Sequence, residues 1–306
     1  MDNYSASAKI IIFGEHAVVY GQPAIAVPVS SLRAYVNVSP SDGGLRLQAL
    51  DVSDSLDTET VQAALTLTAR LVLEHIHVPE PAVTLSIRSQ IPVASGLGSG
   101  AAVATALARA ILATVEHPLP PLELNRIIYE VEKLHHGTPS GIDNTVIVYE
   151  RPVYFVRGQP IETLSIAQPF TLLIADTGVS ASTRVAVGDV RKLYESDKSR
   201  YSAVFHKIGD LVREARTAIE HGHIDALGQL MNQNQLLLQE LTVSSLELDR
   251  LVDAALTAGA LGAKLSGGGR GGNMIALVDS NSVDRVQKSL LASGAVRVFR
   301  TEIGKA

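Results

Sequence analysis

The chain has 306 residues, a formal net charge of −5 and no cysteine, with 46% hydrophobic and 19% charged residues. This composition is typical of a soluble protein of two domains, and it excludes disulfide frameworks and thiolate metal sites. The absence of a Lys/Arg run argues against nucleic-acid binding and a polybasic membrane anchor. No signal-peptide pattern is present, and no apolar stretch reaches the roughly 20 residues of a membrane span. We therefore expect a cytoplasmic protein with small-molecule partners.

The first half of the chain predicts a sheet and three helices. Apolar and alternating runs predict an antiparallel sheet over residues 9–50 and a further strand at 82–89. Apolar residues at helical spacing predict helices over 58–76, 97–115 and 122–135. Further strands are predicted at 145–149, 152–156 and 171–176.

After residue 178 the pattern changes to helices, which are predicted over 182–194, 203–220, 225–240 and 244–258. A strand, a glycine-rich loop, a second strand, a helix and a closing strand follow to the end of the chain. We place a domain boundary near residue 180, which gives an N-terminal domain over 1–180 and a C-terminal domain over 181–306. The predicted fold class is α+β.

The stretch PVASGLGSGAA, residues 92–102, places three alternating glycines directly before a predicted helix. Glycines let the backbone approach a ligand, and a helix N-terminus offers N–H groups and a positive dipole end to an anion. The spacing matches neither a Walker loop nor a dinucleotide fingerprint. The alternative is structural, with Ser95 or Ser99 capping the helix and the alanines allowing close packing. The stretch alone does not decide between the two.

The stretch EVEKLHHGTPSGIDN, residues 130–144, places Glu132 and His136 four apart on one helix face, before a turn that presents Asp143. Gly, Ser and Pro would hold this aspartate on a shaped loop, as a general base requires. The alternative is an Asx-type turn. The adjacent histidines do not face the same way on a helix, which argues against a histidine metal site.

Two further stretches carry unusual residues for their predicted structure. KIIIFGEHAVVYG, residues 9–21, starts a buried strand with Lys9, whose ammonium needs a carboxylate partner. The alternative is a lysine at the sheet edge, with Glu15 and His16 in an exposed polar turn. GGGRGG, residues 267–272, places five glycines between two apolar strands, which favours close backbone approach to a phosphate or substrate over a plain connector.

These four motifs occur in this order over almost the whole chain. Lys9 with GEHAVVYG, then PVASGLGSGAA, HGTPSGIDN and KLSGGGRGG together resemble the GHMP small-molecule kinase superfamily, most of all its mevalonate kinase family. The resemblance implies a two-lobed GHMP kinase fold, with an N-lobe like domain 2 of ribosomal protein S5 and a ferredoxin-like C-lobe. It also implies ATP-dependent phosphorylation of mevalonate at its 5-hydroxyl, with both substrates in the cleft between the lobes and Mg²⁺ as cofactor.

The resemblance also implies residue roles. Asp143 would accept or orient the proton of the attacking hydroxyl, and Lys9 beside it would keep the aspartate ionised. Mg²⁺ would be held by Glu132 and Ser99. The ATP phosphates would be bound by Ser95, Gly96, Leu97, Gly98, Ser99, Gly100 and Ala101. Mevalonate would contact Lys9, Glu15, His16, Ser140, Asp143, Thr183 and Gly268.

The chain departs from the family pattern at three places. Gly100 stands where a second serine usually faces the metal, so Ser99 or water would substitute for that hydroxyl. ASA replaces the usual Ala-Pro-Gly before Lys9. Arg270 stands where a glycine is common, and its side chain would either face solvent or reach a phosphate.

Other functions fit the same motifs. Related kinases act on phosphomevalonate, homoserine or a sugar, but a phosphorylated substrate would need a Lys/Arg pocket that the sequence does not display. A catalytically silent ligand sensor is an alternative from another class, although a sensor need not keep both Lys9 and Asp143. The resemblance also admits a homodimer, while the apolar helices of the second lobe fit packing within one subunit equally well.

Overall fold

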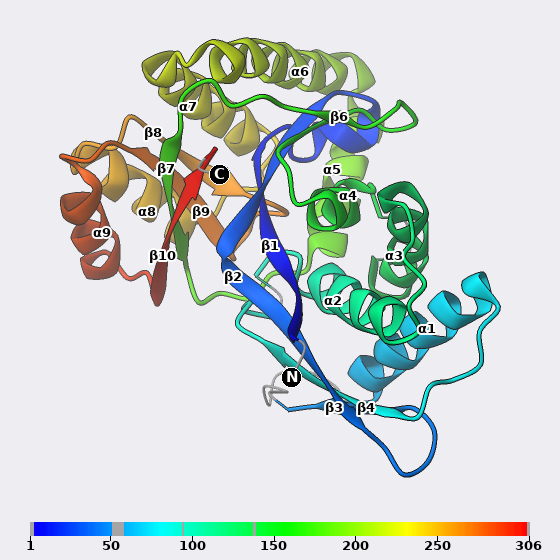
Figure 1. Cartoon of the computed structure of the whole chain (residues 1–306). Helices are drawn as coiled ribbons and strands as arrows, with labels where there is room; N and C mark the ends of the chain where they lie inside the picture. Colours follow the sequence, from blue (N-terminus) through cyan, green and yellow to red (C-terminus); the bar gives the residue numbers. More distant parts are fainter. Residues whose placement is uncertain (1–2, 51–57, 94, 137–138, 305–306) are drawn as a thin grey trace. The chain divides into compact units, whose positions relative to one another are not determined.

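The computed structural model of the chain describes residues 3–50, 58–93, 95–136 and 139–304 (Figure 1). The backbone divides into two compact units that interleave along the sequence. Unit 1 comprises Met1–Lys9, Leu32–Val93 and Leu97–Glu150, and unit 2 comprises Ile10–Ser31, Ala94–Gly96 and Arg151–Ala306. Both combine helices and strands, which confirms the α+β class. The boundary at residue 180 stays a prediction, and residues 151–180 pack with the chain that follows them.

Unit 1 contains a small sheet with a helical connection. Strand β2 (Ala24–Pro40) pairs antiparallel with β4 (Val83–Ser89) through its residues 34–40. Strand β3 (Arg46–Ala49) pairs with β4 in parallel, so the antiparallel prediction is wrong for this strand. The parallel pairing follows because helix α1 (Thr58–Ile76) forms the crossover between β3 and β4.

Three further helices of unit 1 pack against one another: α2 (Ser99–Thr114), α3 (Pro121–His136) and α4 (Ile142–Tyr149). Helix α1 packs on α2 and α3 (Figure 1). Alanines make up much of α2 and most of them are buried, which lets the neighbouring helices approach closely. The helices predicted over 58–76, 97–115 and 122–135 are therefore confirmed.

Helix α4 replaces the strand that the sequence predicted at 145–149. Its β-branched residues favour a strand, but the helix is buried almost all round, so no helical periodicity is visible in the sequence. It begins after Gly141, which has a φ of 93°, and the Thr145 hydroxyl donates to the Gly141 carbonyl oxygen at 2.7 Å. Packing therefore overrides strand propensity, and Asp143 lies in the first turn of a helix rather than on a loop.

Strand β1 (Asn3–Phe13) pairs with β2, and the chain of each passes from one unit into the other. In unit 2, β1 leads into the short 3₁₀ helix η1 (Ala17–Tyr20). There β2 pairs with β5 (Val153–Phe155), and β5 pairs with β6 (Glu162–Thr163), both antiparallel.

The second sheet of unit 2 is antiparallel, with strand order β10-β7-β9-β8. Its strands are β7 (Phe170–Asp176), β8 (Gly262–Ser266), β9 (Asn273–Val278) and β10 (Arg297–Ile303). The helices of unit 2 are α5 (Thr183–Ser196), α6 (Lys198–His221), α7 (Ile224–Glu240), α8 (Leu246–Thr257) and α9 (Val283–Ala292). These bounds confirm the elements predicted after residue 170. Within the described ranges, none of the helices combines the length and the apolar character that a membrane span requires.

Helix α7 covers the free edge of β8. The N–H groups of Ala263 and Leu265 donate to the side-chain oxygens of Asn232 and Gln235, each at 2.9 Å. The helix approaches this closely because two glycines meet at the crossing. A Cβ on Gly228 would lie 2.4 Å from the Leu261 carbonyl oxygen, and a Cβ on Gly262 would lie 2.2 Å from the Gly228 carbonyl oxygen. The edge strand is thus closed to further pairing.

This crossing predicts opposite effects for two helical glycines. Gly228→Ala forces a methyl group into backbone atoms and should lower the free energy of unfolding by about 1–3 kcal/mol. Gly188 lies on α5 with open space at its Cβ position, so Gly188→Ala should raise the free energy of unfolding by about 0.5–1 kcal/mol. Urea unfolding of the two variants measures both effects. Equal changes in the two variants would contradict the steric account.

Candidate active site

An ion pair between Lys9 and Asp143 lies in unit 1. Lys9 Nζ lies 2.9 Å from Asp143 Oδ1, and the two side chains are 3% and 29% exposed. Lys9 comes from β1 and Asp143 from the first turn of α4. The carboxylate offsets the cost of burying the ammonium, so the lysine has the partner that its position in the sequence required. The alternative of a lysine at a solvent-exposed edge is wrong. Because Asp143 is partly exposed, a ligand can reach its carboxylate.

The glycine-rich stretch is anchored beside this ion pair. The backbone N–H of Lys9 donates to the Leu97 carbonyl oxygen at 3.0 Å. The next residue, Gly98, has a φ of 75°, and a Cβ there would lie 2.7 Å from Ile147 Cδ1 and 3.0 Å from Lys9 Cγ. Only glycine fits this position, because a side chain would displace the lysine or the residue from α4. The loop, the lysine and α4 therefore form one packed cluster.

Helix α2 begins directly after Gly98. Gly98 is its N-cap residue, so neither Ser95 nor Ser99 occupies the N-cap position. By helix geometry the N–H groups of Ser99, Gly100 and Ala101 have no intrahelical acceptor, and no acidic residue lies in this turn. The positive end of the helix dipole points the same way. This turn is suited to bind an anion such as a phosphate.

Glu132 of α3 is buried in the same unit and is 2% exposed. Burial raises the pKa of Glu132 to about 8, and the Asp143 carboxylate adds to the rise while the Lys9 ammonium opposes it. A cation bound beside Glu132 would reverse this shift.

Two side chains of unit 1 offer oxygen ligands of the kind that Mg²⁺ prefers. The Glu132 carboxylate and the Ser99 hydroxyl are hard oxygen donors, and Mg²⁺ in nucleotide sites takes one or two carboxylates and completes its octahedron with phosphates and water. A metal site built from protein ligands alone would need at least three such side chains close together. Within the ranges that the structure describes, no three His, Cys, Asp or Glu side chains gather as a metal cluster.

A second cluster lies in unit 2, around the turn that follows β1. Glu15 and His16 are 1% and 6% exposed, so the alternative of an exposed polar turn is wrong. Glu15 Oε1 accepts a hydrogen bond from Lys264 Nζ, and Lys264 is fully buried in β8. Burial lowers the pKa of Lys264, and the Glu15 carboxylate opposes this effect. Sequence analysis missed Lys264, although a lone lysine inside the apolar strand GAKLS could have indicated a buried ion pair.

His16 has an unusual backbone conformation, with a φ of 61° and a ψ of −46°. The Ala17 N–H donates to the Glu15 carbonyl oxygen at 2.6 Å, which makes a γ-turn of the rare positive-φ type. His16 Nε2 lies 3.0 Å from the Gly268 carbonyl oxygen, to which it can donate in the neutral tautomer. Burial lowers the pKa of His16 to about 4, and the charges of Arg270 and Lys264 add to this effect. The imidazole is therefore neutral at pH 7.

The glycine-rich loop between β8 and β9 packs closely on other parts of unit 2. A Cβ on Gly268 would lie 2.9 Å from Thr183 Oγ1, and a Cβ on Gly269 would lie 2.0 Å from the Val243 carbonyl oxygen. At the end of the loop, Asn273 Nδ2 donates to the Ser95 carbonyl oxygen at 2.5 Å. The close approaches at Gly268 and Gly269 require glycine for steric reasons. Ligand binding by the loop stays a prediction.

The remaining predicted residues take the following places. Ser140 precedes α4, and its hydroxyl accepts a hydrogen bond from the Ile142 N–H at 3.4 Å. Arg270 has a φ of 61°, its side chain is 33% exposed, and its guanidinium pairs with Asp189 of α5. In unit 2, Ser95 and Gly96 lie against the loop, with Gly96 Cα 3.9 Å from a Cβ position on Gly267.

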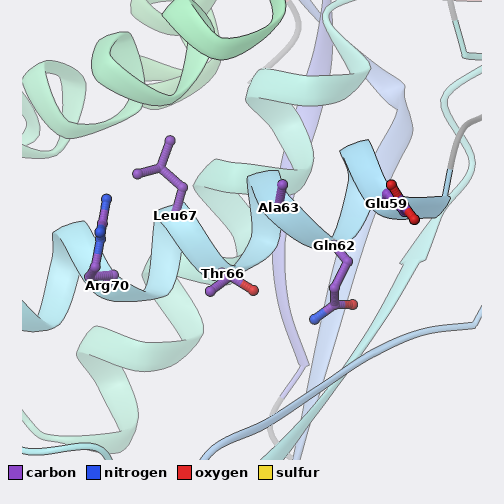
Figure 2. A pocket seen from close by; sticks show the side chains of 6 residues that line it. All are labelled: Glu59, Gln62, Ala63, Thr66, Leu67 and Arg70. Carbon is purple, nitrogen blue, oxygen red and sulfur yellow. The ribbon is translucent and has the colours of Figure 1, made fainter.

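A surface hollow of about 670 Å³ lies along α1 in unit 1 (Figure 2). Its lining residues are Glu59, Gln62, Ala63, Thr66, Leu67 and Arg70. Figure 2 shows these side chains projecting from a single helix without converging on a common point. Binding sites usually combine several elements around a few convergent polar groups. None of the predicted site residues lines this hollow, and we assign it no role.

The buried histidine predicts a pH effect on stability. The unfolded chain binds a proton at His16 near pH 6.5 and the folded chain only near pH 4, so its contribution is complete above about 6.5 and is lost as the pH falls toward 4. The loss is on the order of 3 kcal/mol at most. His16→Gln keeps a side-chain donor without this titration, so its free energy of unfolding should fall less between pH 7 and pH 4.5.

Urea unfolding at the two pH values measures this difference. His117→Gln is the matched control, because His117 is exposed and its replacement should leave the pH dependence of the wild type unchanged. The same pH dependence in wild type and His16→Gln would show that the pKa of His16 is not lowered in the folded chain.

The chain matches two family models, "GHMP kinases N terminal domain" over residues 60–151 and "GHMP kinases C terminal" over residues 215–296. The mevalonate kinase of Thermococcus sibiricus is 38% identical over 313 residues, which cover 95% of this chain and 93% of the relative. The mevalonate kinase of Pyrococcus abyssi is 37% identical over 319 residues, which cover 97% of this chain and 94% of the relative.

The fold is also similar to solved structures. The crystal structure of L. major mevalonate kinase in complex with R-mevalonate matches with a TM-score of 0.87 and 30% identity, and the match covers 100% of this chain and 97% of that one. The predicted two-domain GHMP kinase fold is confirmed by this match together with the two family models. With relatives this similar over nearly its full length, the chain belongs to the mevalonate kinase family of the GHMP kinase superfamily.

Proposed function

We propose that this chain transfers the γ-phosphoryl group of ATP to the 5-hydroxyl of (R)-mevalonate, giving 5-phosphomevalonate and ADP on the mevalonate pathway to isoprenoids. The observation that carries the proposal is the Lys9–Asp143 ion pair, packed against Leu97 and Gly98 at the start of α2. It brings a cation, a carboxylate and an anion-binding helix N-terminus together in unit 1. Phosphoryl transfer to an alcohol asks mainly for this positioning and charge neutralisation.

The ion pair supplies the chemistry at the acceptor hydroxyl. Asp143 accepts the proton of the hydroxyl or orients it, and its partly exposed carboxylate is open to a ligand. Lys9 keeps a positive charge 2.9 Å from that carboxylate, which stabilises the negative charge that develops on the hydroxyl oxygen. Gly98 leaves room for the lysine stem, so the loop and the cation are positioned together.

The glycine-rich stretch binds the phosphates of ATP. The backbone N–H groups at the start of α2 donate to phosphate oxygens, and the helix dipole favours their charge. Glu132 and Ser99 would hold Mg²⁺, which would supply neutralisation of phosphate charge. Because burial raises the pKa of the Glu132 carboxyl, the cation and the ionised carboxylate stabilise each other.

The family resemblance assigns mevalonate contacts to Lys9, Asp143, Ser140, Glu15, His16, Thr183 and Gly268. Support comes from the burial of Glu15 and His16 and from the strained γ-turn at His16, since strain of this kind gathers at functional sites. The similarity to a mevalonate kinase structure that contains R-mevalonate supports the substrate. The cytoplasmic location and the homodimer stay predictions.

A substrate panel with one active-site variant tests the reaction. ADP release is measured with ATP, Mg²⁺ and, separately, mevalonate, 5-phosphomevalonate, homoserine and galactose. The wild type should turn over mevalonate alone, and Asp143→Asn should lower kcat by roughly a thousandfold, because the amide can neither accept the proton nor pair with Lys9. Asp253→Asn, at an exposed position of α8, is the matched control and should keep wild-type kcat.

Each other outcome of the panel identifies a different function. Turnover of another acceptor would keep the kinase and discard mevalonate as the substrate. ATP binding without turnover of any acceptor would favour the ligand sensor. Full activity of Asp143→Asn would remove Asp143 from the reaction.

A second variant pair tests the metal role of α3. Glu132→Gln removes the proposed Mg²⁺ ligand, so the Mg²⁺ concentration for half-maximal activity should rise roughly 10- to 100-fold. Glu130→Gln is the matched control, because Glu130 lies on the same helix but is exposed and pairs with Lys133. Its Mg²⁺ dependence should equal that of the wild type. An unchanged Mg²⁺ dependence of Glu132→Gln would contradict the assignment.

A further inference from the structure

Helix α3 presents three polar side chains along one face. Asn125, Tyr129 and Glu132 are spaced at i, i+4 and i+7, which places them in one row on the helix. Tyr129 donates its hydroxyl to the Pro139 carbonyl oxygen at 3.3 Å. Asn125 hydrogen-bonds to α4, and the charges of Asp143 and Lys9 act on the pKa of Glu132 in opposite directions. The row therefore faces the segment that carries the catalytic aspartate.

Asn125 makes side-chain hydrogen bonds to two consecutive residues of α4. Its Nδ2 donates to Thr145 Oγ1 at 3.2 Å, and its Oδ1 accepts from Asn144 Nδ2 at 2.6 Å. The same Asn144 amide lies 3.3 Å from the Asn125 backbone carbonyl oxygen. All three residues are buried, at 8%, 2% and 1% exposure for Asn125, Asn144 and Thr145. Hydrogen bonds of this kind are costly to break, because no water replaces a lost partner.

Thr145 extends this network to the start of α4. Its hydroxyl donates to the Gly141 carbonyl oxygen at 2.7 Å while it accepts from Asn125. Gly141 is the N-cap of α4, and Asp143 is the second residue of that helix. The network thus fixes the helical turn that presents the carboxylate.

Apolar packing alone would not set the register of these two helices. The other buried residues of α4 are the apolar Ile142, Val146, Ile147 and Val148, and apolar contacts have no direction. Hydrogen bonds do have direction, and a slip by one turn, about 5.4 Å, would break all three bonds made by Asn125 and Asn144. The pair therefore defines one register of α3 against α4.

We infer that Asn125 is a positioning residue that sets the register of α3 against α4 and thereby places Glu132 beside the Lys9–Asp143 pair. Asn125 and Glu132 are separated by seven residues, about 10 Å along a rigid helix, so fixing one end fixes the other. Asn125 contacts neither Lys9 nor Asp143 and acts through helix geometry. The inference rests on the proposed function, because Glu132 matters through the metal it holds.

Asn125→Leu, Thr145→Val and the double variant test this inference. Leu has the same branched arrangement of side-chain heavy atoms as Asn but forms no hydrogen bond, so the Mg²⁺ concentration for half-maximal activity should rise roughly 10-fold or more. The KM for mevalonate should change less than kcat. The two single variants break the same network, so their effects on the Mg²⁺ constant should not add in the double variant. Additive effects, or a wild-type Mg²⁺ constant in Asn125→Leu, would overturn the inference.

A stability control separates positioning from folding. Ile128 lies on the same helix and is fully buried, and Ile128→Ala should lower the Tm as much as Asn125→Leu or more. Its Mg²⁺ constant should equal that of the wild type. A rise in the Mg²⁺ constant of Ile128→Ala to that of Asn125→Leu would show a general effect of destabilisation and overturn the inference. If Asn125→Leu does not fold, Asn125→Ser takes its place in every comparison.

Hydrogen exchange of the protein without nucleotide or metal supplies a readout that is independent of activity. Asn125→Leu should increase amide exchange in the peptide spanning residues 139–149 relative to Ile128→Ala. Unchanged exchange there would overturn the inference even where the kinase assay succeeds. An inactive wild type would contradict the proposed function alone, because the exchange experiment tests the helix register without turnover.

Discussion

A charged lysine inside unit 1 is the constraint on which the rest of the site depends. Lys9 lies in a strand whose following residues are buried and apolar, and its ammonium is stable there because Asp143 lies 2.9 Å away. Meeting that requirement fixes much of the local structure. Helix α4 must begin where it does, Gly98 must lack a side chain, and the Leu97 carbonyl must face the backbone of Lys9. The same contacts therefore stabilise the ion pair and set the geometry of the site.

Unit 2 also contains a buried lysine that needs a carboxylate partner. Lys264 is fully buried in β8 and pairs with Glu15, so strand and turn are held together by a charge pair rather than by packing alone. His16, which follows Glu15 in the sequence, has a strained positive-φ backbone conformation, and its burial lowers its pKa. The strained conformation of His16 would not be expected on an exposed loop. The Glu15–Lys264 pair thus anchors the GEH turn on β8.

In unit 1 the sequence patterns predicted the helices whose apolar residues repeat at helical spacing and missed α4, where no such spacing is visible. Helices α1, α2 and α3 were predicted because their apolar residues repeat at helical spacing. Helix α4 was not, since burial on nearly all sides hides the period and its β-branched residues favour a strand. Lys9 and Asp143 could be predicted from the cost of burying an ammonium and from the family motifs. Asn125 could not, because a single polar residue on a helix is expected to face solvent until its distant partner, Thr145, is known. Lys264 was missed, although its place inside an apolar strand indicates a buried ion pair of the kind it makes with Glu15.

The substitution at Gly100 gives the helix register a larger role in this chain. Where the family pattern has a second serine in the first turn of α2, Gly100 offers no hydroxyl, so Ser99 is the one hydroxyl side chain in the sequence SGAA that begins the helix. A metal held by fewer protein oxygens depends more on the position of each one. In the proposed metal site Glu132 would then be the principal protein ligand, and its position would follow that of α3. A chain that gives up one metal-side hydroxyl must hold the remaining carboxylate in place, and the buried bonds of Asn125 to α4 are suited to that task.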